Sequence, residues 1–315
     1  MNFLKERLFL FTFAILALFS ISWLLSKNLV SNIPVMHAVG LRLCATAAAL
    51  WLMTLFREKA VFRSLPLLSM IPSFLILSVL GFSLYFICSF GALKSLKASD
   101  LTMVLATIPG ITYILGTLTN SLIFSWFKLI GMIIVSVAAI AFNINNIEGE
   151  SYSLIGIALA LTAAFSYSAY GLLSKHYLKN LPLLTSLAWI TTISAVSFIP
   201  FFIFDPTPLF YLKLEDILKI LILATVCSAP VYVLYQKVLA EGGVLYANTI
   251  GVLSPFAVVT CEWIIGSSPS LNMIKIIAMI MAVIGMSLLF IDASKVSKWQ
   301  QKRHSKNSKF NEEIK

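Results

Sequence analysis

Charged residues are scarce in this chain. They make up 11% of its 315 residues, whereas 59% are hydrophobic. Soluble globular domains are about a quarter charged, so the composition excludes an ordinary water-soluble fold. The apolar residues form continuous stretches of about 20 residues, the length that a helix needs to cross a bilayer. Because the strands of a membrane barrel would alternate apolar and polar residues, the sequence predicts an all-α membrane protein.

The residue types that build catalytic and metal sites are also few. The chain has four cysteines and three histidines, and no two cysteines have CxxC spacing. We find no Ser/His/Asp set, no paired carboxylates and no glycine-rich phosphate loop behind a strand. The sequence therefore predicts neither an enzyme nor a metal or cofactor site.

The net charge of +10 comes from basic residues that lie between and after the apolar stretches. Seven of them are in the segment from Lys295 to Lys315. A basic segment beside a membrane helix is typical of contact with anionic lipid. We therefore expect residues 293–315 to be a disordered cytoplasmic tail that binds the bilayer surface, and we expect no nucleic-acid partner.

One short motif occurs twice along the chain. The letters LLSK at residues 24–27, followed by Pro34, return at residues 172–175, followed by Pro182. Pro109 has a counterpart at nearly the same spacing in Pro255. Repetition at a fixed offset is the mark of a duplicated unit. The sequence predicts two repeats, residues 1–147 and 148–292.

Breaks at charged residues, proline, asparagine and glycine predict ten transmembrane helices. The expected ranges are 8–29, 35–55, 66–90, 99–119, 123–143, 153–175, 183–204, 216–238, 244–265 and 273–292. Each half then holds five, and because five is odd, the second half enters the membrane from the opposite side. Two inverted five-helix repeats are typical of secondary transporters, which bind substrate near the midplane between the repeats.

The distribution of lysine and arginine predicts the orientation. With both termini in the cytoplasm, 16 basic residues lie on the inner side and 6 on the outer side. Cytoplasmic loops carry the excess of basic residues. We expect a multi-pass membrane protein with both termini cytoplasmic.

The order of these features, over about residues 8–292, resembles the drug/metabolite transporter superfamily and, within it, the EamA family. In the first half the resemblance rests on three features: an aromatic residue in the first helix, a proline followed by an arginine in the second helix, and small residues between the third and fourth helices. The fourth helix then has a proline near its middle. These features are Trp23, Pro34, Arg42, Tyr85-Phe86, Gly91, Ala98-Ser99 and Pro109. The second half repeats part of the order as Tyr232, Gly242-Gly243 and Pro255.

The resemblance implies a ten-helix, inverted-repeat secondary transporter of a bacterial inner membrane that moves a small metabolite by alternating access without a cofactor. Export of amino acids or related compounds is common in the family and is the favoured expectation. Uptake of a metabolite, transport of a lipid-linked headgroup, and a non-transporting sensor or scaffold remain open. The chain lacks the family's frequent glutamate about a dozen residues after each proline, and Arg42 has Ile190 as its counterpart. Substrate and oligomeric state are not implied.

Two charged residues are candidates for function. Arg42 lies about eight residues into its helix and is the only charge expected deep within a span, where a charge is costly unless it faces protein or water. A structural arginine that caps carbonyls is the alternative. Glu262 is expected at a similar outer depth, so we hypothesise that the two form an ion pair or gate. For Glu262 a solvated helix end is the alternative.

A set of aromatic and polar residues is expected to line a substrate pocket that accepts a neutral or aromatic molecule by stacking and a few hydrogen bonds. Core packing and interfacial positions are the alternative for these side chains. Two prolines are expected to interrupt helices beside the pathway, with packing kinks as the alternative. The pocket residues are Trp23, Arg42, Tyr85, Tyr170, Tyr232, Gln236 and Asn248, and the prolines are Pro109 and Pro255.

Overall fold

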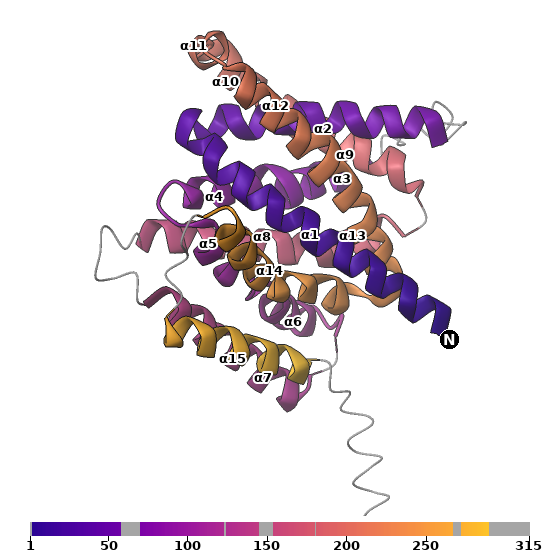
Figure 1. Ribbon diagram of the computed structural model, residues 1–315. Helices are drawn as coiled ribbons and strands as arrows, with labels where there is room; N and C mark the ends of the chain where they lie inside the picture. Colours follow the sequence, from indigo (N-terminus) through magenta and orange to yellow (C-terminus); the bar gives the residue numbers. More distant parts are fainter. Residues whose placement is uncertain are drawn as a thin grey trace, which may run out of the picture.

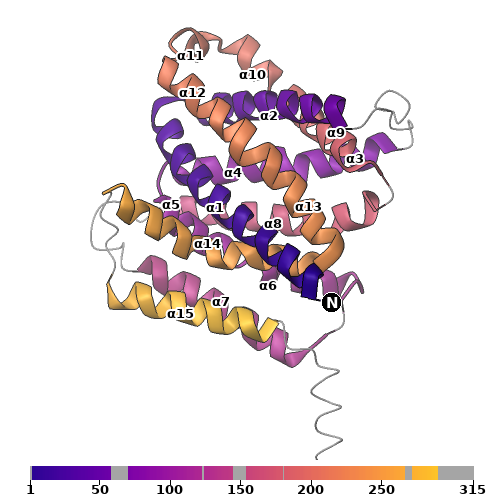
Figure 2. The ribbon, with the colours of Figure 1, turned by 45° about the vertical axis from the view of Figure 1, so that its right-hand side comes forward.

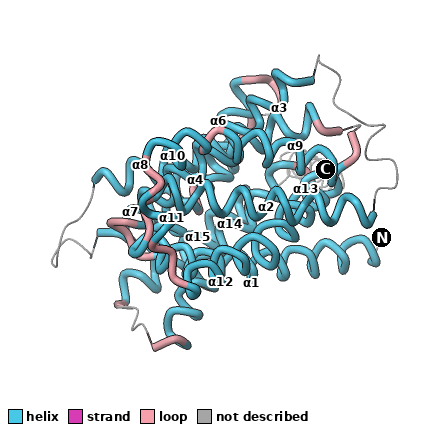
Figure 3. The backbone as a smooth tube through the Cα atoms, turned by 90° about the horizontal axis from the view of Figure 1, so that it is seen from above, coloured by secondary structure: helices cyan, strands magenta, loops and turns pink. Residues whose placement is uncertain are grey.

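The computed structural model describes residues 2–57, 70–122, 124–144, 154–179, 181–266 and 272–289. Within these ranges the chain forms helices and loops and no strand (Figures 1 and 3). The all-α prediction is therefore confirmed for this part of the chain. The expected junction near residue 147 and the basic tail at 293–315 lie outside the described residues.

The first half begins with two long helices and ends with one that is set apart. Its elements are α1 (Asn2–Asn32), α2 (Val35–Arg57), α3 (Ile71–Ser78), the π-helical η3 (Val79–Ser83), α4 (Leu84–Leu93), α5 (Ala98–Leu105), α6 (Ile108–Leu118) and α7 (Trp126–Ile144).

The second half contains a similar succession with two additional short helices. Its elements are α8 (Leu154–Tyr177), α9 (Leu183–Val196), α10 (Ile199–Phe204), α11 (Thr207–Phe210), α12 (Leu214–Ile222), the π-helical η4 (Leu223–Ser228), α13 (Ala229–Gly242), α14 (Val244–Ile264) and α15 (Met273–Leu289).

Eight helical stretches in the described ranges are long and apolar enough to cross a membrane. Two further apolar helices, Trp126–Phe142 and Met273–Leu288, are shorter. Each of the ten expected ranges overlaps one of these stretches. The ranges 99–119 and 183–204, expected as single helices, are each divided into two, α5 with α6 and α9 with α10.

The two prolines differ in their effect on the backbone. α5 ends at Leu105, and Pro109 occupies the first turn of α6, where its missing N–H would have no intrahelical partner in any case. Pro255 lies inside α14, which continues unbroken to Ile264. The expected interruption at Pro255 is therefore wrong, and membrane helices tolerate such a proline when neighbouring groups satisfy the freed carbonyl.

The two π-helical segments, η3 and η4, fall at corresponding places in the two halves. Each continues an α-helix on both sides, joining α3 to α4 and α12 to α13. A π-turn inserts an extra residue into a helix, so it rotates the side chains that follow it, and such turns are frequent at functional sites. The hydrophobic pattern of the sequence did not reveal them.

The long helices of each half pack against helices of the other half. α1 packs against α13 and α14, and α8 packs correspondingly against α4 and α6. α2 packs on α9, while α7 and α15 pack on each other at the lower edge of the molecule in Figures 1 and 2. A Cβ at Gly285 would lie 2.7 Å from the carbonyl oxygen of Gly131, so the close approach of α15 to α7 requires glycine there.

Candidate functional site

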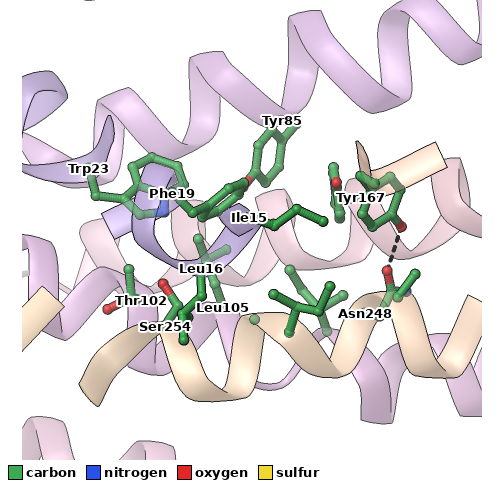
Figure 4. A pocket seen from close by; sticks show the side chains of 15 residues that line it. Ile15, Leu16, Phe19, Trp23, Tyr85, Thr102, Leu105, Tyr167, Asn248 and Ser254 are labelled. Carbon is green, nitrogen blue, oxygen red and sulfur yellow. Dashed lines mark hydrogen bonds between the residues drawn. The ribbon is translucent and has the colours of Figure 1, made fainter. Parts of the chain in front are cut away.

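Two adjoining cavities lie between helices of the two halves. Counting all the empty space, including that at their open mouths, they measure about 470 and 460 Å³. The first extends along α14 (Figure 4) and the second extends to α2 and both π-helical segments. Their shared wall consists of Phe19, Trp23, Tyr85, Tyr167 and Tyr235.

Tyr167 of α8 lies at the centre of an aromatic cluster. Its ring centroid is 4.7 Å from that of Tyr85, 5.3 Å from Tyr235 and 5.7 Å from Tyr170. The ring of Trp23 contacts Tyr85 edge-on at 6.3 Å. Offset and edge-to-face pairs of this kind pack rigidly and present ring faces and edges to a ligand.

Arg42 lines the second cavity and is buried, with 4% of the residue exposed. Its Nε donates to Ser228, Nη1 to Ser26 and Nη2 to Ser22, at 2.9–3.2 Å. The guanidinium carbon lies 4.4 Å from the ring centroid of Phe86. All of these partners are neutral, and none of the described carboxylates forms an ion pair with Arg42.

A chain of hydrogen bonds lies along the first cavity where α13 and α14 meet it. The hydroxyl of Tyr235 donates to Oδ1 of Asn248 at 2.6 Å, a bond drawn in Figure 4. Nδ2 of Asn248 donates to the hydroxyl of Thr112 at 2.6 Å. This chain joins α13, α14 and α6 and fixes the orientation of the Asn248 amide.

Three buried polar atoms of the first cavity have no protein hydrogen-bond partner in the described ranges. They are Nε1 of Trp23, the hydroxyl oxygen of Tyr85 and Oγ of Ser254. All three residues are at most 3% exposed. Buried polar groups are nearly always satisfied by protein or by a bound molecule, so these three atoms are the groups of the first cavity that are free to bond to a ligand.

Six of the seven expected pocket residues line the cavities. Gln236 does not, because it lies one layer behind, where its amide donates to the hydroxyl of Tyr170 at 2.7 Å. The six are Trp23, Arg42, Tyr85, Tyr170, Tyr232 and Asn248. The structure thus brings them together; that they bind substrate stays a prediction.

The sequence-based selection omitted Tyr167 and Tyr235, which the structure places in the shared wall. Their spacing contained the signal. Tyr167 lies three residues before Tyr170, and Tyr232 lies three residues before Tyr235, and residues three apart lie on the same face of a helix. The two prolines do not line the cavities, although each directly follows a lining residue, Ile108 or Ser254.

The expected ion pair between Arg42 and Glu262 is absent from the described structure. Oε1 of Glu262 instead accepts from the backbone N–H of Ser99 at 3.3 Å, in the first turn of α5, where N–H groups lack helical partners. Glu262 therefore does connect the two halves, but through a helix end. It is 7% exposed, so a solvated helix end is also wrong.

Arg42 is not the only buried charge. Nζ of Lys275 lies 3.6 Å from Oδ1 of Asp100, and both residues are at most 4% exposed. This pair joins α15 to α5 beside the Glu262 contact. Lys275 is one of the six basic residues expected on the outer side of the membrane. Its burial follows from the contact of α15 with α7, where its Nζ lies 5.0 Å from the ring centroid of Phe142.

The model of the EamA-like transporter family matches residues 7–144 and again residues 154–291. The chain belongs to the EamA-like transporter family. An uncharacterized transporter, YdfC of Bacillus subtilis (strain 168), is 30% identical over 169 residues, which cover 52% of this chain and 53% of YdfC. The chain thus spans about half the length of this relative in the matched region.

A solved crystal structure of another protein has the same fold. It superposes with a TM-score of 0.70 at 15% sequence identity, over 90% of this chain and 97% of that one. The EamA-like match and the apolar helices identify an integral membrane protein of a transporter family. Its aromatic cavity has the side chains to bind a small molecule by stacking and hydrogen bonding.

Proposed function

We propose that this EamA-like protein is a secondary transporter that carries a small metabolite across a bacterial inner membrane by alternating access. Export of an amino acid or a related compound is its favoured activity, and both termini lie in the cytoplasm. The substrate site is the pair of aromatic cavities at Tyr167. The observation that most directly supports this site is that both halves contribute to the shared wall. Trp23 and Tyr85 belong to the first half, and Tyr167 and Tyr235 to the second.

A cavity whose wall is built from both halves is suited to a mechanism in which the two halves rock against each other. When one repeat tilts against the other, a site between them opens first to one side and then to the other. The reciprocal packing of α1 and α8 on the opposite halves supports an inverted repeat of five helices each. The start of α1 and the end of α15 lie on the same side of the helix bundle in Figure 1, which supports termini in one compartment.

The composition of the cavities supports a small, largely apolar cargo over a lipid-linked headgroup. A pyrophosphate-bearing headgroup carries several negative charges and would need several cations. Arg42 is the one cation among the described residues that line the two cavities. The remaining lining is aromatic, aliphatic, hydroxyl or amide in character.

Flux through proteoliposomes tests the proposal. The purified protein would be reconstituted into lipid vesicles. The vesicles would then be loaded with a panel of radiolabelled amino acids, nucleosides and cationic drugs. We expect efflux of at least one amino acid or related metabolite above protein-free vesicles, and a loss of that efflux in Arg42→Ala. Absence of flux across the whole panel would contradict a transporter of these classes and favour a sensor or scaffold.

A further inference from the structure

We propose that Arg42 binds a carboxylate, and that the substrate of this transporter is a small organic acid with an aromatic or otherwise apolar body. The inference rests on the proposed function and names the substrate class of the same site. It assigns the carboxylate to the Arg42 end of the cavities and the apolar body to the wall around Tyr167.

The first argument is the uncompensated charge of Arg42. A buried cation is expensive unless an opposite charge and hydrogen bonds compensate it. The three serine hydroxyls supply hydrogen bonds but no negative charge. The hydroxyl of Tyr232 lies beside the same guanidinium and is also neutral. An incoming anion would supply the missing charge.

The second argument is geometric preparation. A guanidinium has five N–H donors in a rigid plane, and the serines take three of them from three different nitrogens. These bonds and the ring of Phe86 at 4.4 Å fix the plane before substrate arrives. A fixed guanidinium plane suits the flat, two-oxygen carboxylate better than a point-like partner.

The third argument is the chemistry of the rest of the lining. From Arg42 the cavities continue along the rings of Tyr85 and Tyr167 to Asn248 and Ser254 on α14 (Figure 4). The ring faces suit an aromatic or aliphatic body, and the unpartnered Nε1 of Trp23 and Oγ of Ser254 suit a polar substituent on it. No acidic side chain is among the described lining residues. A positively charged amino group on the substrate would therefore interact with the faces of the aromatic rings. The carboxylate is therefore the required group.

Two matched probe pairs test the assignment on the unmodified protein. Each pair replaces the carboxylate by a neutral carboxamide: 3-phenylpropionate with 3-phenylpropanamide, and L-phenylalanine with L-phenylalaninamide. Binding would be measured by equilibrium dialysis with the full chain in nanodiscs at pH 7.4. We expect at least one acid to bind about tenfold or more tightly than its amide, because a charge-assisted hydrogen bond is lost with the carboxylate.

Equal binding of acid and amide in both pairs would overturn the carboxylate assignment. Binding of neither acid at millimolar concentration would overturn the substrate class. Both results are distinguishable from failure of the proposed function, because flux of another metabolite through the same protein would uphold transport while the assignment fails.

Variants of Arg42 locate the effect. Arg42→Met keeps the length of the side chain and removes the charge, so we expect acid binding to weaken at least about tenfold while amide binding changes little. Arg42→Lys keeps the charge without the planar fork and should be intermediate. Lys128→Met, which removes a cation whose Nζ lies 5.8 Å from the Tyr113 ring centroid and outside the cavities, is the matched control. Undiminished acid binding in Arg42→Met would overturn the proposal; should that variant fail to fold, the probe pairs on the unmodified protein still decide.

Discussion

The amide nitrogen of Asn248 lies 2.6 Å from the hydroxyl oxygen of Thr112, and this bond joins α14 of the second half to α6 of the first. The same amide accepts from Tyr235 through its oxygen. One side chain therefore holds two helices at the edge of the cavity. Its removal would leave buried partners on both sides without a hydrogen bond.

Asn248→Leu tests the contribution of this amide to stability. We expect the free energy of unfolding to fall by about 1–2 kcal/mol, near the upper range for interhelical hydrogen bonds in membrane proteins. Unfolding by SDS in mixed micelles would measure it. The control is Thr260→Ala on the exposed face of the same helix, whose hydroxyl bonds only its own helix at Phe256. Equal stability of Asn248→Leu and the control would show that the chain of bonds contributes nothing.

For the buried pair of Asp100 and Lys275, we expect a single substitution to lower the free energy of unfolding much more than the double substitution does. Lys275→Met leaves a desolvated carboxylate without its cation, which costs about 3–5 kcal/mol in buried pairs. The double variant with Asp100→Asn removes both charges and should recover most of the loss. The same unfolding assay measures both.

A surface pair provides the comparison. Glu215→Gln breaks the contact with Lys219 at the exposed partner, whose side chain is 71% exposed, and such pairs contribute about 1 kcal/mol or less. A double variant at Asp100 and Lys275 that is no more stable than Lys275→Met alone would contradict the predicted charge pairing.

Substitution of Gly81 in η3 is expected to cause a steric clash with Tyr170, a residue that lines the second cavity. A Cβ at this position would lie 2.3 Å from Cδ2 of Tyr170, so Gly81→Ala must displace that ring and its bond from Gln236. We expect a loss of about 1–3 kcal/mol in unfolding free energy, typical of overpacking. Adding Tyr170→Leu should restore part of it.

Gly251→Ala is the control for this steric effect, because the nearest atom to its Cβ, the carbonyl oxygen of Leu105, is 3.9 Å away. It should unfold at nearly the same denaturant concentration as the unmodified protein. If Gly81→Ala were as stable as Gly251→Ala, the predicted clash with Tyr170 would be refuted.

With both termini in the cytoplasm, as proposed, Glu262 lies toward the outer side of the membrane, so we expect its contact to control access to the cavity from outside the cell. Its carboxylate accepts from the first turn of α5, where a negative charge is stabilised by about 0.3–2 kcal/mol. Glu262→Ala removes this link between the halves and should favour opening on that side. Cys227, which is 2% exposed and lines the second cavity, then becomes accessible more often.

The measurement is the rate at which a membrane-impermeant maleimide labels Cys227 in intact cells, quantified by peptide mass spectrometry. We expect a rise of about two- to tenfold in Glu262→Ala, from the free energy of the lost contact, and a smaller rise in Glu262→Gln. Glu215→Gln, which changes an exposed glutamate, should leave the rate unchanged. An unchanged rate in Glu262→Ala would show that the contact does not close the outer side.

The sequence by itself determined the helical membrane fold and much of the cavity. Continuous apolar stretches leave a membrane chain few alternatives to helices, because backbone groups in lipid must be hydrogen-bonded within the segment. The cost of a charge within a span identified Arg42. The repeated order of Trp23, Tyr85, Tyr170 and Tyr232 indicated aromatic residues that the structure then places around the same space. These are properties of single helices and their spacing.

Only the tertiary structure decided which charges and rings meet. The partner of Glu262 is the end of α5 rather than Arg42, and Lys275 is buried beside Asp100. The π-helical segments η3 and η4 precede Tyr85 and Tyr232, respectively. They set the rotation of α4 and α13, and so the direction in which these two tyrosines point. Each of these depends on how two helices approach, and that is determined by packing between residues far apart in the sequence. A local pattern indicates which face of a helix is buried, but not which neighbour covers it.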